Sequence, residues 1–293
     1  MATSLGYPLT HPDKVLYPAQ GITKHDLLEY YALVAPRMLP HVAARPLTLV
    51  RCPEGQDQPC FFQKHPGQGL PAGVHTVPVA EKKGTAAYAV IYDAQGLFGL
   101  VQLGVLEIHT WGSHVDDSDH PDLMVFDLDP GPAVEFKRLV HAALRLRELF
   151  ADARLNSFVK TTGGKGLHVC VPIQPKLEWE PVKDFCAGVA HALVLESPHH
   201  YTAAASKAAR TGKIFIDYLR NARGATFVAP YSTRARPGAP IATPLDWNEL
   251  ASLQEPAQFT VSNIEQRLSA LPGDPWVHVL DAQRALKPTH QSD

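Results

Sequence analysis

The sequence has little of what several classes of protein require. It contains four cysteines in 293 residues, none in a C-x-x-C pair, and no uncharged apolar run long enough to span a bilayer. These shortages argue against a disulfide-stapled secreted scaffold and against a transmembrane helix. Residues 1–6 carry neither a basic flank nor an apolar stretch, which argues against a secretory signal. We therefore expect reduced cysteines, a cytoplasmic location and no association with membranes.

An excess of charge of either sign is also missing. With 27 basic and 29 acidic side chains, the formal net charge is -2, which taken alone argues against a nucleic-acid partner. The charge is nevertheless segregated, because residues 107–129 hold seven acids and no Lys or Arg, whereas residues 207–236 hold seven basic side chains and one acid, Asp217. A nearly neutral chain can therefore still present a local basic surface to phosphates.

Hydrophobic periodicity predicts a mixture of helices and strands. Helices are expected over residues 23–38 (with Thr23 as N-cap), 134–150 and 182–195. Strands are expected over residues 46–51, 86–92, 122–129, 157–160, 167–173, 214–218 and 226–229, while residues 97–106 are compatible with either. The helix at 134–150 is expected to bury Phe136, Leu139, Val140, Ala143, Leu144 and Leu149. Because helices and strands do not alternate strictly, we expect an α+β fold with largely antiparallel sheets.

Three aspartates lie in strand-like segments. Side chains alternate along a strand, so Asp127 and Asp129 project from one face while Phe126 and Leu128 point into a core. Adjacent carboxylates repel unless a cation neutralises them, and hard divalent ions with oxygen ligands supply that cation. Asp217, in a second apolar strand, completes a set that suits two metal ions. The alternative is a solvated strand end before the Pro130-Gly131 turn.

A glycine loop follows, between two strand-like segments. Gly163, Gly164 and Gly166 allow consecutive backbone N–H groups to form an anion-binding nest, beside Thr162 and Lys165. The spacing differs from that of the nucleotide P-loop. A glycine hairpin with a solvated lysine is the alternative, and His168 taken alone is more typical of a core histidine.

Two further groups of residues have ambiguous patterns. The loop at residues 231–238 carries Arg234 and Arg236, whose guanidinium groups suit phosphate oxygens, although a solvated basic face is the alternative. Cys52, Cys60 and His65 could be read as metal ligands, but their spacing fits no zinc template.

These motifs, in this order, resemble the polymerase domain of bacterial ligase D, in the archaeo-eukaryotic primase superfamily. The resemblance covers about residues 9–250. It is carried by LTHPDKVLYP (9–18), QPCFFQK (58–64), EIH (107–109), FDLDP (126–130), TTGGKGLH (161–168), IDYLRN (216–221), APYS (229–232) and RARPG (234–238).

The resemblance implies a single primase-polymerase domain over residues 1–293, with two largely antiparallel sheets flanked by helices. Within it, residues 9–100 would form an N-terminal portion with a 5′-phosphate pocket, 101–250 the catalytic core and 251–293 a C-terminal extension. The implied activity is template-directed nucleotidyl transfer, by gap filling and end extension at double-strand breaks in non-homologous end joining. Nucleoside triphosphates, preferably ribonucleotides, would be the substrates and two Mn²⁺ or Mg²⁺ ions the cofactors. Ku and a DNA ligase would be partners, and the protein would be located in the cytoplasm at the nucleoid.

The resemblance also implies roles for particular residues. The metal ligands would be Asp127, Asp129 and Asp217. The nucleotide would be held by His109, Thr162, Gly163, Gly164, Lys165, His168, Arg220 and Arg234. The DNA would be held by His11, Lys14 and Lys24 at a 5′-phosphate and by Phe61 and Phe62 stacking on a template base. The family usually has Ser where Thr162 stands, so the hydroxyl is kept. Alternatives are a primase that starts chains de novo, a non-catalytic end-binding module and a phosphohydrolase.

Overall fold

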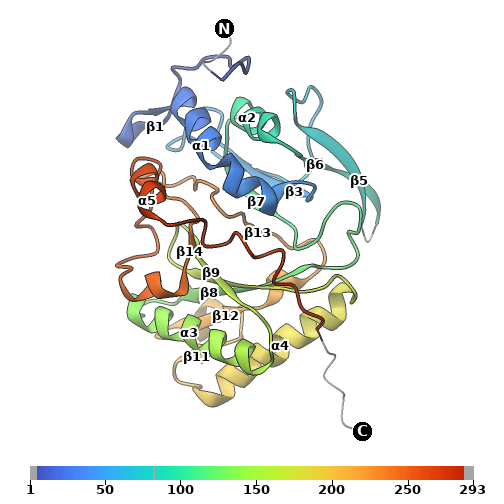
Figure 1. Ribbon diagram of the computed structural model, residues 1–293, viewed down its shortest axis with the longest axis vertical. Coiled ribbons are helices and arrows are strands. Elements are labelled where there is room, and N and C mark those ends of the chain that lie inside the picture. The colour runs from blue at the N-terminus through green and yellow to red at the C-terminus, as the bar shows by residue number, and fades with distance from the viewer. Residues whose placement is uncertain (1–4, 82, 287–293) are drawn as a thin grey trace. The chain divides into compact units, whose positions relative to one another are not determined.

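A computed structural model of the chain describes residues 5–81 and 83–286 (Figure 1). The chain divides into two compact units. Unit 1 comprises Met1–Trp111, Val228–Thr243 and Phe259–Asp274, and unit 2 comprises Gly112–Phe227, Pro244–Gln258 and Pro275–Asp293. Among the described residues, no helix is long and apolar enough to cross a membrane. The predicted single domain over 1–293 stays a prediction, and residues 1–4, 82 and 287–293 of it lie outside the described residues.

Unit 1 is built on an antiparallel sheet in the order β13-β7-β3-β6-β5, with β4 paired to β3. Its strands are β3 (Leu47–Arg51), β4 (Phe61–Gln63), β5 (His75–Glu81), β6 (Gly84–Val90), β7 (Val105–Thr110) and β13 (Phe227–Val228). A separate pair joins β1 (Val15–Tyr17) to β2 (Ile22–Thr23). The helices are α1 (Lys24–Val42), α2 (Ala94–Gln102) and α5 (Ile264–Ala270), and α1 lies beside α2 (Figure 1).

The start of α1 confirms the predicted N-cap. Thr23 Oγ1 accepts a hydrogen bond from Asp26 N at 3.2 Å, and Asp26 Oδ2 accepts one from Thr23 N at 2.8 Å. This reciprocal capping box satisfies two N–H groups that the helix itself leaves unpaired. The helix ends at Val42, four residues beyond the predicted boundary, because its apolar face continues through Met38 to that residue. The ambiguous residues 97–106 divide between α2 and β7, with Asp93 capping α2 at Gly96 N.

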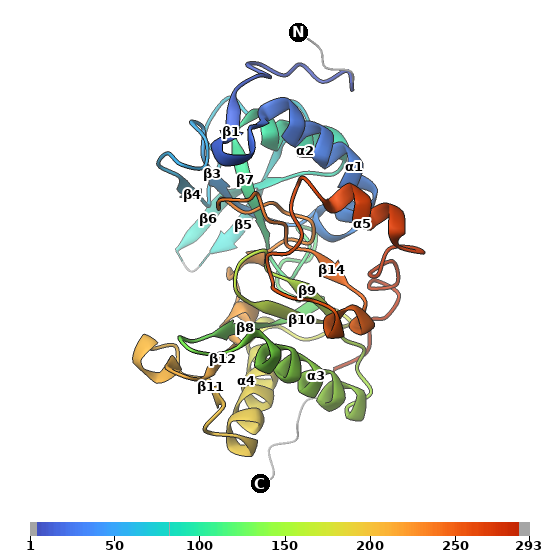
Figure 2. The same ribbon diagram turned by 90° about the vertical axis from the view of Figure 1, so that its left-hand side faces the viewer.

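Unit 2 contains a sheet in the order β11-β12-β8-β10-β9-β14, antiparallel except between β11 and β12. Its strands are β8 (Leu123–Pro130), β9 (Phe158–Thr161), β10 (Leu167–Pro172), β11 (Tyr201–Thr202), β12 (Ile214–Asp217) and β14 (Pro244–Leu245). Helices α3 (Phe136–Asp152) and α4 (Trp179–Glu196) cover one face of it (Figure 2). Phe126 packs toward this side, with its ring centroid 5.2 Å from that of Phe150 on α3. The predicted α+β fold with antiparallel sheets is confirmed, and the aspartate face of β8 is the one opposite α3.

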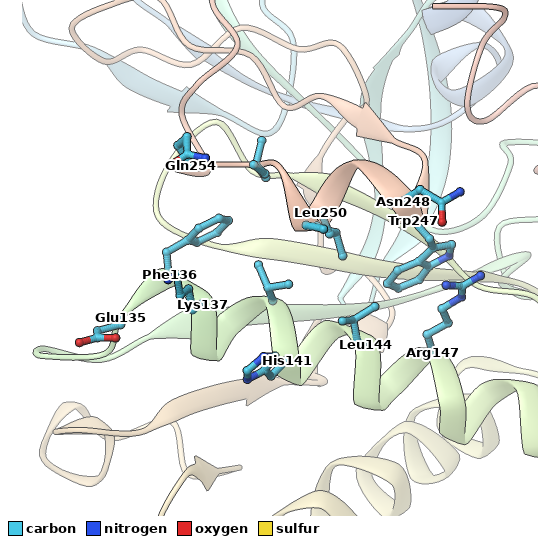
Figure 3. A pocket seen from close by; sticks show the side chains of 13 residues that line it. Glu135, Phe136, Lys137, His141, Leu144, Arg147, Trp247, Asn248, Leu250 and Gln254 are labelled. Carbon is cyan, nitrogen blue, oxygen red and sulfur yellow. The ribbon is translucent and has the colours of Figure 1, made fainter.

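The buried face of α3 differs from the predicted one. Leu139, Ala142, Ala143, Leu146 and Phe150 are the buried residues. Three residues expected in the core, Phe136, Val140 and Leu144, instead line a pocket of about 720 Å³ together with Trp247, Leu250 and Leu253 (Figure 3). The reason is that the short 3₁₀ helix η4 (Trp247–Ala251), distant in sequence, lies against this side of α3 and leaves it half-covered.

The cysteines correct another prediction. Cys52 and Cys60 form a disulfide, so the expectation that all four thiols are reduced is wrong for this pair. The reason is the register of β3 and β4, in which Arg51 pairs with Phe61 and thereby brings the two flanking cysteines opposite each other. Because each sulfur is bonded to the other, the alternative of a metal site at these cysteines and His65 is also wrong. Cys170 and Cys186 are free and buried.

Candidate functional site

Four ionisable side chains form a row across the sheet of unit 2. Lys160 on β9 pairs with His168 on β10, His168 with Asp127 on β8, and Asp127 with Asp217 on β12. Directly opposed residues on antiparallel strands place their side chains on the same face. All four are buried, with exposed fractions between 0% and 8%. Two acids and two bases withdrawn from water in this way must compensate one another, which is typical of a functional site rather than a packing core.

Arg220 neutralises both carboxylates in this row. Its Nε lies 3.4 Å from Asp127 Oδ2 and 3.2 Å from Asp217 Oδ2. The arginine belongs to the short 3₁₀ helix η3 (Leu219–Asn221), where the Asn221 side chain bonds both Val125 N and Val125 O at 2.8 Å. Leu219 N also donates to Asp217 Oδ1 at 2.9 Å. The turn after β12 is thus tied to β8, and it holds Arg220 beside the two carboxylates.

Asp129 has a different cation. Its Oδ2 lies 3.7 Å from Arg210 Nη1, and the Arg210 guanidinium lies 3.8 Å from the ring centroid of Phe215, the residue opposite Asp129 on β12. Sequence reasoning counted Arg210 in the basic stretch but did not select it as a site residue. Its position just before the strand that carries Asp217 could have indicated that it lies near the carboxylates.

The local environment shifts the pKa values of these side chains in different directions. Burial would raise the pKa of Asp127, but His168 and Arg220 outweigh burial and lower it. Burial and the charge of Asp127 raise the pKa of Asp129, and burial raises that of Asp217. Burial, reinforced by the charge of Lys160, lowers the pKa of His168 to about 4, so this imidazole is neutral at pH 7. The site therefore presents a charged Asp127 flanked by two carboxyls that hold protons more readily than usual.

The donors in this face fit a divalent cation. Asp127 Oδ1 lies 3.4 Å from His168 Nε2, is buried and makes no hydrogen bond. Such an oxygen gains a partner when a hard, oxygen-seeking cation binds. Within residues 5–81 and 83–286, however, no three His, Cys, Asp or Glu side chains already converge as a metal cluster. The predicted metal-ligand role of Asp127, Asp129 and Asp217 stays a prediction.

The glycine loop leads directly into this row. Thr162 Oγ1 accepts hydrogen bonds from Gly164 N at 3.3 Å and Gly166 N at 3.2 Å. A Cβ on Gly166 would lie 2.6 Å from the Leu128 carbonyl oxygen, so only glycine lets β10 start this close to β8. The Lys165 side chain is exposed. Two of the N–H groups expected to form an anion nest are thus turned toward Thr162 here, and the loop's binding role stays a prediction.

Unit 1 holds a second group of predicted nucleotide-site residues. His109 Nε2 lies 2.8 Å from Glu107 Oε2, and Arg234 Nε lies 3.0 Å from the same oxygen. Sequence reasoning selected His109 and Arg234 but missed Glu107. It also missed Lys160 of the row in unit 2. The signal for Glu107 was its i, i+2 relation to His109, which puts both on one face of β7.

The predicted 5′-phosphate residues are brought together by the backbone that precedes α1. Lys14 N donates to His11 O at 3.1 Å, and Lys24 N donates to Lys14 O at 2.8 Å. Lys24 Nζ donates to Thr10 O at 2.9 Å, whereas Lys14 Nζ forms an ion pair with Glu54 at 2.8 Å. Burial and the charge of Lys14 lower the pKa of Lys24 to about 8.

Phe61 and Phe62 are both exposed, at 47% and 75%, so neither ring belongs to the core. Arg51 lies over the Phe61 ring, and the Phe62 ring centroid is 6.3 Å from that of His109. Two neighbouring aromatic rings without a core to enter are available for stacking on a ligand.

Comparisons with known proteins agree with the residue-level resemblance. The family described as the LigD primase-polymerase domain matches residues 23–276. The multifunctional non-homologous end joining protein LigD of Pseudomonas aeruginosa is 38% identical over 276 residues, which is 94% of this chain and 33% of that protein. The LigD of Mycobacterium tuberculosis is 39% identical over 250 residues, which is 83% of this chain and 33% of that protein. The chain thus spans about a third of the length of these curated relatives.

A solved structure gives the same answer for the fold. The polymerase domain from Mycobacterium tuberculosis ligase D, in complex with DNA, is similar with a TM-score of 0.86 and 35% sequence identity, covering 94% of this chain and 98% of that one. Members of the matching family are nucleotidyltransferases of the polymerase type. The chain belongs to the family of LigD primase-polymerase domains.

Proposed function

We propose that this protein transfers nucleotides from nucleoside triphosphates to a primer 3′-hydroxyl at DNA gaps and broken ends, in non-homologous end joining. The observation that carries the proposal is the face of β8, where Asp127 stands opposite Asp217 and shares its side with Asp129. Polymerases need carboxylates grouped in this way to hold the divalent ions that a phosphoryl transfer uses. The DNA bound to the solved relative supports the choice of substrate.

The residues of unit 2 would carry the chemistry. Asp127, Asp129 and Asp217 would hold two divalent ions, Mn²⁺ or Mg²⁺, which when bound lower the pKa of the attacking hydroxyl and neutralise charge on the leaving pyrophosphate. Arg220 now neutralises Asp127 and Asp217. Cations that take over this neutralisation would release its guanidinium for the triphosphate.

Further predicted residues would bind the nucleotide and the DNA. In unit 2, the loop from Thr162 through Gly163 and Gly164 to Lys165, followed by His168, would contact the triphosphate. Because His168 is neutral at pH 7, it would act as a hydrogen-bond donor rather than as a cation. In unit 1, His109 and Arg234 would bind the nucleotide, Phe61 and Phe62 would stack on a template base, and His11, Lys14 and Lys24 would bind a 5′-phosphate.

A primer-extension assay on gapped DNA tests the proposal most directly. We expect template-directed addition that requires a divalent ion, prefers Mn²⁺ and ribonucleotides, and increases when the gap carries a 5′-phosphate. Template and triphosphates without primer should give no dinucleotide, since product there would indicate a primase. Triphosphate hydrolysis without primer would indicate a phosphohydrolase, and binding without any addition an end-binding module. Pull-down with Ku and with a DNA ligase tests the proposed partners.

The preference for a 5′-phosphate is predicted to fall as pH rises through about 8. The pKa of Lys24 is lowered to about 8, so its ammonium group is charged below that pH and neutral above it. Losing one charge-assisted hydrogen bond to the phosphate should reduce the affinity ratio of phosphorylated to unphosphorylated gaps about tenfold. The measurement is the dissociation constant for both gaps between pH 7 and pH 9.5.

Lys24→Arg is the matched control for this titration, because arginine keeps its charge across the range. The variant should retain a preference that is independent of pH, and Lys24→Ala should lose it at every pH. Equal weakening of both gaps in Lys24→Ala, or an unchanged pH dependence in Lys24→Arg, would contradict the assignment.

A further inference from the structure

Glu107 is a buried acid of unit 1 whose carboxylate has several polar partners, and the proposed function gives it no role. Its side chain is buried, yet both of its oxygens are in use. Oε2 accepts a hydrogen bond from His109 Nε2 at 2.8 Å and forms an ion pair with Arg234 Nε at 3.0 Å, and Oε1 accepts a hydrogen bond from Ala235 N at 3.0 Å. A carboxylate with three partners, two of them predicted nucleotide ligands, lies at the centre of this group.

The backbone around Arg234 is held by contacts that do not involve Glu107. Ile108 N donates to Ser232 Oγ at 2.8 Å, and Thr233 Oγ1 donates to Leu106 O at 2.6 Å. Tyr17 Oη donates to the carbonyl of Arg234 at 2.9 Å. Two hydroxyl groups of the loop thus attach it to β7, and the Tyr17 hydroxyl attaches it to β1. The Glu107 carboxylate contacts instead the side chains of His109 and Arg234, whose orientation it can set, and the N–H group of Ala235.

The particular atoms that Glu107 engages have consequences for both partners. Because Nε2 of His109 bonds a carboxylate, that nitrogen carries the hydrogen, and this selects the tautomer or the protonated form of the ring. Arg234 meets Glu107 through Nε at 3.0 Å, and this ion pair restrains the planar guanidinium beside His109. Burial would raise the pKa of Glu107, but His109 and Arg234 lower it to about 2, so the carboxylate is charged throughout the neutral range.

We propose that Glu107 is a positioning residue, which orients the Arg234 guanidinium and the His109 imidazole for the triphosphate substrate without touching that substrate. The inference rests on the proposed function, because it assumes that these two residues bind the nucleotide. An arginine already held by a buried carboxylate loses less conformational freedom when a phosphate binds its guanidinium. Glu107 thereby contributes to nucleotide affinity through its neighbours.

The test compares steady-state nucleotide addition on gapped DNA by wild type, Glu107→Gln, Arg234→Ala and the double variant. Glutamine keeps the shape but loses the charge, so KM for the triphosphate should rise about tenfold while kcat and DNA affinity change less than about threefold. In the double variant, KM should rise by less than the product of the two single-variant effects, because Glu107 acts in part through Arg234. Glu29→Gln, which alters a Glu–His pair on α1, is the matched control and should leave KM unchanged.

The outcomes separate this inference from the proposed function. If wild type adds nucleotides and Arg234→Ala raises KM, but Glu107→Gln does not, the positioning role is overturned and the function stands. A fully additive double variant also overturns it. If wild type adds none, both proposals fall. Glu107→Asp keeps the charge but shortens the side chain, so a raised KM at an unchanged melting temperature would support positioning even if the glutamine variant folds poorly.

Discussion

Asp127→Ala is expected to reduce nucleotide addition by about 10³-fold or more while leaving DNA binding intact. The carboxylate lies opposite Asp217, contacts His168 and Arg220, and has a buried oxygen without a hydrogen bond. Losing it removes a ligand from the proposed cation site, and several kcal/mol of transition-state stabilisation correspond to a factor of this size. Single-turnover extension of a gapped primer, together with a DNA-binding titration, measures the two effects separately.

Asp119→Ala provides a control from the same acidic stretch. Its carboxylate is mostly exposed and forms an ion pair with Arg223, so removal should change the rate little. Asp217→Ala should be as inactive as Asp127→Ala, because the two face each other in the row. Full activity of either variant would show that this face of β8 is not the catalytic one.

Gly131→Ala is expected to cause the largest loss of stability of any alanine substitution considered, about 3 kcal/mol. A Cβ at this position would overlap the carbonyl oxygen of Arg210 and lie 2.8 Å from that of Lys213, and both are backbone atoms that cannot rotate away. The Gly131 N–H also donates to Lys213 O at 2.9 Å. Nucleotide addition should fall as well, because the close contact between Gly131 and residues 210–213 keeps Arg210 beside Asp129.

Thermal or urea denaturation measures this effect, and Gly188→Ala is its matched control. Gly188 is an exposed position of α4, and its Cβ would meet no atom within 4 Å. Alanine favours a helix interior over glycine by about 1 kcal/mol, so this variant should be slightly more stable than wild type. Similar stability of the two variants would contradict the close approach at Gly131.

Local patterns were sufficient for the elements that carry the site. Alternation along residues 123–130 predicted which side of β8 holds Asp127 and Asp129, because the strand period of two is a property of the backbone itself. The cap at Thr23 was predictable for the same reason, since a hydroxyl followed three residues later by an acid satisfies the first N–H groups of a helix. Motif resemblance then identified the family, which the comparisons confirmed.

Patterns failed where a distant segment decides what is buried. The apolar period of residues 136–150 is compatible with several adjacent faces, and only the packing of η4 against α3 leaves Phe136, Val140 and Leu144 around a pocket. Pairing between Cys52 and Cys60 depends on the register of two strands, which spacing alone does not specify. In both cases the decisive contact comes from a segment that is not adjacent in the sequence.

Residue patterns were enough to predict the family, the α+β class, the carboxylate face and the segregation of charge that a net value of -2 conceals. Three relations depend on the folded chain: Lys160 lies in the same row as His168 and Asp127, Arg220 neutralises Asp127 and Asp217, and Glu107 joins His109 to Arg234. The physical reason is that a buried charge must find its counter-charge in space, and sheet register, not sequence distance, determines which residues meet.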